Sequence, residues 1–247
     1  MSRYFLEVSY KGSRYSGFQT QENANTVQAE VEKAFRILQR EEVEMTGSSR
    51  TDSGVHALQN FFHFDFGSEL HPQFVYKINA ILPPDIVVEG VKLVSDEAHC
   101  RFDALSREYK YFIYRHKDPF LEDRAYYFPY KIDRLKLQQA ADILKEYTDF
   151  TSFSKRNTQV KTFECSIERS QWIEEGDCLV YNVVANRFLR GMVRALTATM
   201  LKVGRGKLLL DEFRTIIEAK DCTRASFAVP AHGLFLVSVT YPEEKVG

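Results

Sequence analysis

The alternation of apolar and polar residues along this chain predicts an α+β protein. A period of two is typical of strands with a buried face, and a period of three to four is typical of helices with an apolar stripe. The period of two predicts strands at residues 3–10, 60–66, 86–94, 109–114, 164–172, 178–185 and 234–241. The helical period predicts helices at residues 26–39, 72–81, 133–145, 188–203 and 211–219.

Strands and helices alternate in two rounds, which predicts two halves of similar architecture. The first round has the order β-α-β-α-β and ends near residue 100, and the pattern restarts after Arg101. This order favours helices packed on a sheet layer. We expect an N-terminal domain at residues 1–102 and a C-terminal domain at residues 103–247, with no flexible linker between them.

The composition is ordinary for a globular protein: 247 residues, 44% of them hydrophobic and 27% charged. No apolar run approaches the roughly 20 residues that cross a bilayer, and the N-terminus is already strand-like rather than a signal peptide. We therefore expect a cytoplasmic protein without a membrane segment. The histidines and cysteines lack metal-ligand spacing, so we predict no metal site. Four cysteines far apart in the chain are expected to be reduced and mostly buried: Cys100, Cys165, Cys178 and Cys222.

Positive charge is concentrated locally, although the formal net charge is only −1. The stretch from Val183 to Lys207 contains no acidic residue and six basic ones: Arg187, Arg190, Arg194, Lys202, Arg205 and Lys207. A second enriched stretch contains Arg101, Arg107, Lys110, Arg115 and Lys117. A basic face on a neutral protein can bind nucleic acid. A solvated helix face is the alternative explanation.

A polar turn with the sequence G-S-S-R-T-D-S-G, residues 47–54, leads into the strand at residues 60–66. Serines and glycine favour a constrained loop here, and loops on a rigid scaffold often carry catalytic side chains. An aspartate in such a turn commonly caps the backbone, and an arginine two residues away is commonly a weak, solvated partner. The turn alone therefore leaves the role of Asp52 and Arg50 open.

The string R-T-D-S-G-V-H-A at residues 50–57 resembles the R-T-D-x-G-V-H-A signature of the tRNA pseudouridine synthase A (TruA) family. Similar segments are Y-K-G-S-R-Y-S-G-F-Q at residues 10–19, R-F-D-A-L-S-R-E-Y-K-Y at 101–111, N-R-F at 186–188 and M-V-R at 192–194. The resemblance covers nearly the whole chain. It implies two ferredoxin-like α+β halves, with mostly antiparallel sheets joined into one central sheet, helices packed on it and an active-site cleft between the halves.

The resemblance also implies an activity and a partner. Family members isomerise uridine to pseudouridine in the anticodon stem-loop of tRNA, at positions 38 to 40, without a cofactor and as homodimers. The reaction breaks the bond from C1′ of the sugar to N1 of the base and forms a bond from C1′ to C5. It involves no redox change and no transfer to another molecule, which agrees with the absence of a cofactor requirement.

The family's functional residues carry over to matching positions of this chain. Asp52 corresponds to the catalytic aspartate, which acts at the sugar carbon as a nucleophile or electrostatic stabiliser. Arg194 corresponds to its partner, and a nearby arginine lowers the pKa of a carboxylate. Tyr109 corresponds to the tyrosine against the target base, proposed to assist proton removal from C5. Arg50 corresponds to the arginine that takes part in flipping the base out of the RNA.

A further set of residues is expected to bind RNA or to shape the cleft: Phe18, Gln19, His56, Arg107, Asn186, Arg187, Phe188 and Arg190. For His56, structural packing is an equally good explanation. Tyr111, on the same strand face as Tyr109, is expected to be an ordinary packing residue.

The chain departs from the family pattern at positions that concern RNA contacts and loop geometry. Ser49 stands where the family usually has glycine, Phe18 replaces tryptophan, and Thr20 stands where a basic residue is common. These departures bear on which uridines are modified, so a paralogue with other RNA targets is one alternative. A catalytically silent RNA-binding protein is another. A glycoside hydrolase would need a second acid roughly 5–9.5 Å from the first, and the signature offers none.

Overall fold

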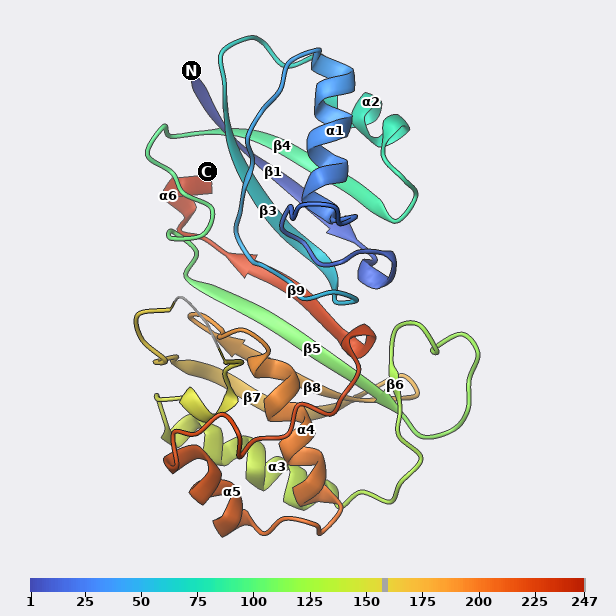
Figure 1. The fold of residues 1–247 in the computed structure, drawn as a ribbon, viewed down its shortest axis with the longest axis vertical. Helices are drawn as coiled ribbons and strands as arrows, with labels where there is room; N and C mark the ends of the chain where they lie inside the picture. The colour runs from blue at the N-terminus through green and yellow to red at the C-terminus, as the bar shows by residue number, and fades with distance from the viewer. Residues whose placement is uncertain (157–159, 247) are drawn as a thin grey trace. The chain divides into compact units, whose positions relative to one another are not determined.

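The protein divides into two compact units in a computed structural model that describes residues 1–156 and 160–246. Unit 1 contains Met1–Leu105 and Leu236–Gly247, and unit 2 contains Ser106–Phe235 (Figure 1). The division near residue 105 lies close to the expected one. The C-terminal residues 236–247 group with unit 1 rather than with the second half.

Unit 1 is built on a sheet with the strand order β4-β1-β3-β9. Strand β1 is antiparallel to both β3 and β4, and a short strand β2 is antiparallel to β3. The strands are β1 (Ser2–Tyr10), β2 (Thr46–Gly47), β3 (His56–Phe66), β4 (Ile86–Val94) and β9 (Leu234–Thr240). The helical elements are η1 (Gly12–Arg14), α1 (Val27–Gln39), α2 (Phe74–Ile81) and α6 (Glu243–Val246).

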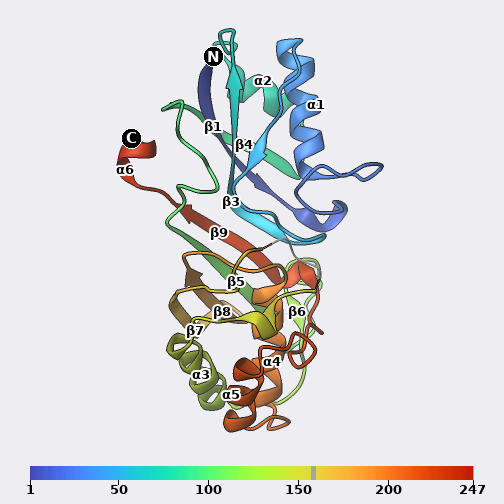
Figure 2. The same cartoon turned by 60° about the vertical axis from the view of Figure 1, so that its left-hand side comes forward.

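Helices α1 and α2 lie on one face of this sheet (Figure 2), and aromatic side chains form the core between them and β3. The ring of Phe35 in α1 packs edge-on against Phe64 and Phe66 of β3 and Phe74 of α2, with ring centres 5.2–5.8 Å apart. The helix begins after Thr26, whose hydroxyl accepts a hydrogen bond from a backbone N–H of the first turn. Threonine is one of the residues preferred at this capping position.

Unit 2 is built on an antiparallel sheet with the order β5-β8-β7, and β6 runs parallel to β5. Helices α3, α4 and α5 pack on one another beside this sheet (Figures 1 and 2). The strands are β5 (Ser106–Tyr114), β6 (Tyr126–Tyr127), β7 (Ile167–Glu175) and β8 (Cys178–Ala185). The helices are α3 (Arg134–Ile143), η2 (Leu144–Glu146), η3 (Thr151–Phe153), α4 (Met192–Gly204), α5 (Leu210–Glu218) and η4 (Ala231–Gly233).

The predicted α+β class is confirmed, and the predicted bounds of β4 and β8 match the structure. The predicted start of α4 at Phe188 is wrong, because Gly191 adopts the left-handed conformation with φ 74° and the helix begins at Met192. Strand β7 lies three residues later than predicted and runs up to a turn at Gly176, where φ is 58°. The two-residue strands β2 and β6 were not predicted, because two residues are too few to show a period.

The distribution of cysteines agrees with the expectation from their spacing. Cys100, Cys165 and Cys178 are buried free thiols, and Cys222 is partly exposed. Across residues 1–156 and 160–246, no helix combines the length and the apolar character that crossing a bilayer requires.

Candidate active site

Asp52 lies on a short loop that connects β2 to β3 in unit 1. We call residues 48–55 the Asp52 loop. The carbonyl of Asp52 accepts a hydrogen bond from the Val55 N–H at 3.2 Å, which closes a tight turn. Gly54 has a φ of 79°, a value that glycine adopts without strain. Asp52 is partly exposed and Arg50 is exposed, so both side chains of the predicted site remain accessible on a constrained backbone.

A buried polar network supports this loop from the sheet. The Tyr10 hydroxyl lies 2.8 Å from the Thr51 hydroxyl. The Asn60 side chain donates to the Tyr10 hydroxyl at 3.2 Å and to the Ser49 carbonyl at 2.8 Å. All four residues are buried. Sequence reasoning missed Asn60, although a polar residue inside a strand of phenylalanines is a usable signal, since buried polar groups need partners.

The segment that precedes α1 supports the same loop from its other flank. The Phe18 N–H donates to the Thr51 carbonyl at 3.1 Å, and the Ser53 hydroxyl donates to the Tyr15 carbonyl at 3.0 Å. Residues 51 and 53 are therefore both tied to this segment, and they flank Asp52. Residues 10–19 and 50–57, which resemble the family in separate segments of the sequence, thus pack against each other.

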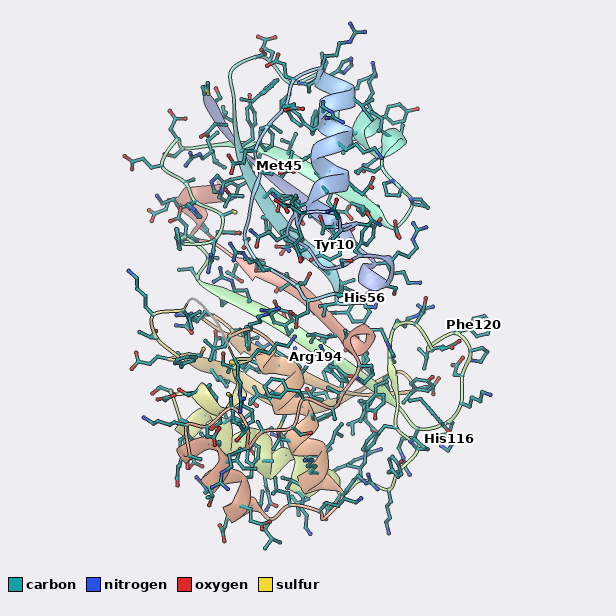
Figure 3. The ribbon with its side chains drawn as sticks, in the orientation of Figure 1. Tyr10, Met45, His56, His116, Phe120 and Arg194 are labelled. Atoms are coloured by element: carbon teal, nitrogen blue, oxygen red, sulfur yellow. The ribbon has the colours of Figure 1, made fainter. Side chains whose placement is uncertain are left out.

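The two stretches also approach each other closely at Gly12. Its N–H donates to the Nδ1 atom of His56 at 3.1 Å. A Cβ atom on Gly12 would lie 1.9 Å from the Val55 carbonyl oxygen, so a side chain cannot be accommodated without moving the backbone. His56, labelled in Figure 3, is 1% exposed, and its Nδ1 atom accepts from the backbone of η1.

An ion pair anchors the segment around η1 to the rest of unit 1. The Asp85 carboxylate accepts hydrogen bonds from the Arg14 guanidinium at 2.6 Å and the Tyr15 hydroxyl at 2.7 Å. Burial raises the pKa of Asp85, but these two hydrogen bonds outweigh it and hold the pKa below its usual value. The Lys11 N–H also donates to the Asp85 carbonyl at 2.9 Å. The support of the Asp52 loop is therefore itself fixed.

The other residues predicted for unit 1 have different environments. Phe18 is 1% exposed and stacks on Phe62, with ring centres 4.6 Å apart. Gln19 is exposed. Phe18 thus contacts the core under the Asp52 loop, while Gln19 lies at the surface beside it.

Four predicted residues of unit 2 come together where β5 and β8 pair. Tyr109 and Phe188 pack edge to face, with ring centres 5.1 Å apart and an angle of 82°. The Arg107 guanidinium donates to the Asn186 carbonyl at 2.9 Å, and the Asn186 side chain accepts from the Ser166 N–H at 2.8 Å. Tyr109 is 8% exposed, so most of its ring is packed against protein.

Arg194 lies in the first turn of α4 (Figure 3). Its Nε and Nη2 atoms donate to the Val229 carbonyl at 3.1 and 2.7 Å. The adjacent carbonyl, that of Pro230, accepts from the Tyr111 hydroxyl at 2.8 Å. Burial raises the pKa of Tyr111, against an opposing effect of the Arg194 charge, so the hydroxyl stays a neutral donor. Tyr111 is fully buried as predicted, and it also braces the segment that orients Arg194.

The remaining predicted arginines precede α4. Arg187 is partly buried and donates to the Thr162 hydroxyl at 3.4 Å. Arg190 is exposed, and its carbonyl accepts from the Lys155 N–H at 2.9 Å.

Asp52 and Arg50 belong to unit 1, and Tyr109 and Arg194 to unit 2, so the pairing of Asp52 with Arg194 stays a prediction. In the described parts of the chain, no three His, Cys, Asp or Glu side chains form a group suited to a metal ion.

A partly exposed carboxylate on a backbone fixed at both flanks suits chemistry at an electron-poor carbon. Such a group can serve as a nucleophile or as an electrostatic stabiliser, and a rigid support keeps it aimed without reorganisation. The aromatic pair and the arginines of unit 2 are side chains that stack on bases and bind phosphate.

Comparison with known proteins gives a consistent result. A family model described as tRNA pseudouridine synthase matches residues 7–103 and 145–242. The tRNA pseudouridine synthase A of Parabacteroides distasonis is 47% identical over 246 residues, covering 99% of this chain and 98% of that protein. The proteins of the same name from Porphyromonas gingivalis and Bacillus subtilis are 42% and 38% identical, covering 99% and 95% of this chain and 99% and 97% of those proteins.

Proposed function

Since the chain belongs to the tRNA pseudouridine synthase family, and is accordingly an isomerase, we propose that Asp52 is its catalytic residue. We propose uridines of the tRNA anticodon stem-loop, at positions 38 to 40, as its substrates. The observation that carries the assignment is the Asp52 loop. Its backbone is tied down on both sides of an aspartate that remains partly exposed.

In the proposed reaction, the Asp52 carboxylate acts at C1′ of the target nucleotide while the bond from C1′ to N1 breaks. The freed uracil turns and C5 forms the new bond to C1′. C5 then loses its proton and N1 gains one, so that the product is an isomer of the substrate. Carboxylates play the corresponding part at the sugar carbon in glycosidases.

Arg194 and Tyr109 complete the proposed site. The Arg194 guanidinium complements the negative charge of the Asp52 carboxylate, and the Val229 carbonyl restricts the orientation of that guanidinium. Tyr109 lies against the uracil and assists removal of the C5 proton. Its ring is supported by Phe188.

A base inside a stem must leave the stack before it can reach the carboxylate, and extrusion costs a few kcal/mol. The exposed Arg50 offsets part of this extrusion cost by stacking and by phosphate contact. Gln19, Arg187 and Arg190 add surface contacts to the RNA. Phe18 and His56 act indirectly, as supports of the Asp52 loop. The enzyme works on tRNA in the cytoplasm, as a homodimer.

The decisive experiment replaces Asp52 by Asn, which keeps the size of the side chain and removes its charge. Pseudouridine formation in tRNA should be abolished, while the Kd for tRNA stays within about tenfold because most affinity comes from phosphate contacts. Asp96→Asn is the control, since it removes an exposed carboxylate elsewhere in unit 1 and should keep full activity. Turnover by the Asp52→Asn variant would remove Asp52 from the mechanism.

A further inference from the structure

The acid-free stretch from Val183 to Lys207 forms two separate basic groups in the structure. Arg187, Arg190 and Arg194 lie before α4 or in its first turn, whereas Lys202, Arg205 and Lys207 lie at its other end. At a rise of about 1.5 Å per residue, Arg194 and Arg205 are separated by about 16 Å along the helix axis. The proposed active-site role of Arg194 therefore does not explain the second group.

The second group adjoins an exposed tyrosine from another part of unit 2. The Arg205 guanidinium lies 3.7 Å from the centre of the Tyr130 ring and 5.9 Å from that of Phe128. The two segments are joined by a hydrogen bond from the Asp133 N–H to the Gly204 carbonyl at 2.8 Å. Tyr130 is 47% exposed. We call the following five residues the α4 C-terminal patch: Tyr130, Lys131, Lys202, Arg205 and Lys207.

Among the residues that the structure describes, the cations of this patch lack acidic partners, unlike several other cations of unit 2. Elsewhere in unit 2, Arg134 pairs with Glu174 at 2.5 Å and Lys110 pairs with Glu175 at 2.7 Å. Within residues 1–156 and 160–246, no carboxylate lies within ion-pair distance of the four cations of the patch. The flanking acids serve as helix caps. Asp133 accepts from the first turn of α3, and Glu212 accepts from the Leu209 N–H at the start of α5.

A purely structural role accounts for only part of this arrangement. Cations at a helix C-terminus are stabilising by roughly 0.3–1 kcal/mol through the helix dipole, which covers Lys202 in the last turn of α4. It does not account for the exposed Lys131 and Lys207 or for the half-exposed Tyr130.

We propose that the α4 C-terminal patch binds the sugar–phosphate backbone of the same tRNA, away from the nucleotide that reacts. This inference rests on the proposed function. Lysine and arginine without acidic partners complement phosphate, and a guanidinium stacked on Tyr130 has less freedom left to lose when it binds a phosphate bidentately. Cations interleaved with an exposed aromatic ring are the surface that nucleic acids favour.

The test is a Lys202→Glu/Lys207→Glu double variant, with Lys33→Glu/Arg36→Glu as the matched control. The control makes the same change of net charge on α1, where both cations already have acidic partners. Binding of full-length tRNA is measured over a range of KCl concentrations, and the single-turnover rate of pseudouridine formation is measured at saturating tRNA. A Lys202→Gln/Lys207→Gln variant, milder than charge reversal, guards against loss of folding.

We expect the charge-reversal variant to bind tRNA at least about tenfold more weakly and to lose up to about two units of slope in log Kd against log [KCl]. The neutral variant should show a smaller loss in the same direction. The single-turnover rate at saturation should stay within about twofold of wild type, and the control should match wild type in both measurements.

Three results are distinguishable. A wild-type enzyme that forms no pseudouridine in tRNA would overturn the proposed function. An active wild type whose patch variants keep the same Kd and salt slope would overturn the present inference alone. Patch variants whose oligomeric state changes in analytical ultracentrifugation, with tRNA affinity unchanged, would also overturn the present inference. They would identify the patch as a protein interface.

Discussion

The loop that carries Asp52 and the helix that carries Arg194 fix their side chains in different ways. The Asp52 loop has no regular structure of its own, and it depends on contacts from Tyr10, Asn60 and the segment around Gly12. Arg194 lies on a helix whose backbone is fixed by its own hydrogen bonds, so only its guanidinium needs an external partner. A functional residue on a loop is therefore more sensitive to distant substitutions than one on a helix.

Among substitutions that leave the proposed catalytic residues in place, the largest expected effect comes from adding one methyl group beneath the Asp52 loop. In Gly12→Ala, the new Cβ would lie 1.9 Å from the Val55 carbonyl oxygen, so the backbone of the loop or of η1 must shift. A displacement of about 1 Å at a reacting group can reduce rates about 100-fold. We expect a loss of that order in the single-turnover rate of pseudouridine formation, with the chain still folded by circular dichroism.

Gly90→Ala is the matched control for this substitution. Gly90 lies in β4 of the same unit, and no atom lies within 4 Å of the position its Cβ would take. Its activity should equal that of wild type. A Gly12→Ala enzyme as fast as the control would contradict the importance of loop support.

A smaller effect is expected from the support of Arg194 in unit 2. Tyr111→Phe removes the hydrogen bond to the Pro230 carbonyl next to Val229. The loss of one buried hydrogen bond should lower the free energy of unfolding by about 1 kcal/mol. Because the segment that orients Arg194 becomes looser, we expect the rate at saturating tRNA to fall about tenfold, less than for Gly12→Ala.

Tyr181→Phe separates a positioning role of Tyr111 from simple stability. Tyr181 is equally buried in the same unit, and its hydroxyl lies 3.0 Å from the Ser170 hydroxyl. Both variants should lose similar stability in denaturant titrations, but only Tyr111→Phe should lose turnover. Equal rates for the two variants would show that Tyr111 is only a packing residue.

The last expected effect is on stability rather than on turnover: the pH dependence of stability should originate in unit 1. The ring centres of His63 and His99 are 4.5 Å apart. The Nδ1 atom of His63 lies 3.2 Å from the Cys100 sulfur. Burial, followed by the charges of His99 and Arg3, lowers the pKa of His63 to about 4. Between pH 6.5 and about 4, the unfolded chain binds a proton that the folded chain does not. The free energy of unfolding should therefore decrease as the pH is lowered through this range, by at most ~1.4 kcal/mol per pH unit.

Denaturant titrations between pH 7 and pH 4.5 check this expectation. His63→Gln should flatten the pH dependence, because the buried group that resists protonation is gone. His116→Gln should not, since His116 is exposed on the loop that also carries Phe120 (Figure 3). A slope unchanged by His63→Gln would assign the acid sensitivity to other groups.

The sequence indicated which single residues belong to the candidate site, but not how their side chains are oriented. The string R-T-D-S-G-V-H-A identified Asp52 and Arg50, and the structure has them on an accessible, constrained loop. The same reasoning placed Phe18 and His56 among the residues that bind RNA or shape the cleft, with packing an equally good explanation for His56, and both are buried. A motif shows that a residue matters at a position, but the direction of its side chain depends on what packs around it.

The sequence by itself determined the type and order of the long elements, because the period of apolar residues decides locally which face of a strand or helix is buried. The tertiary structure alone decided three other features. Residues 10–19 pack against the Asp52 loop, residues 236–247 belong to unit 1, and Arg205 contacts the ring of Tyr130. These features join residues distant in the chain, and no local pattern encodes such pairs, since their energy arises only when the whole core has packed.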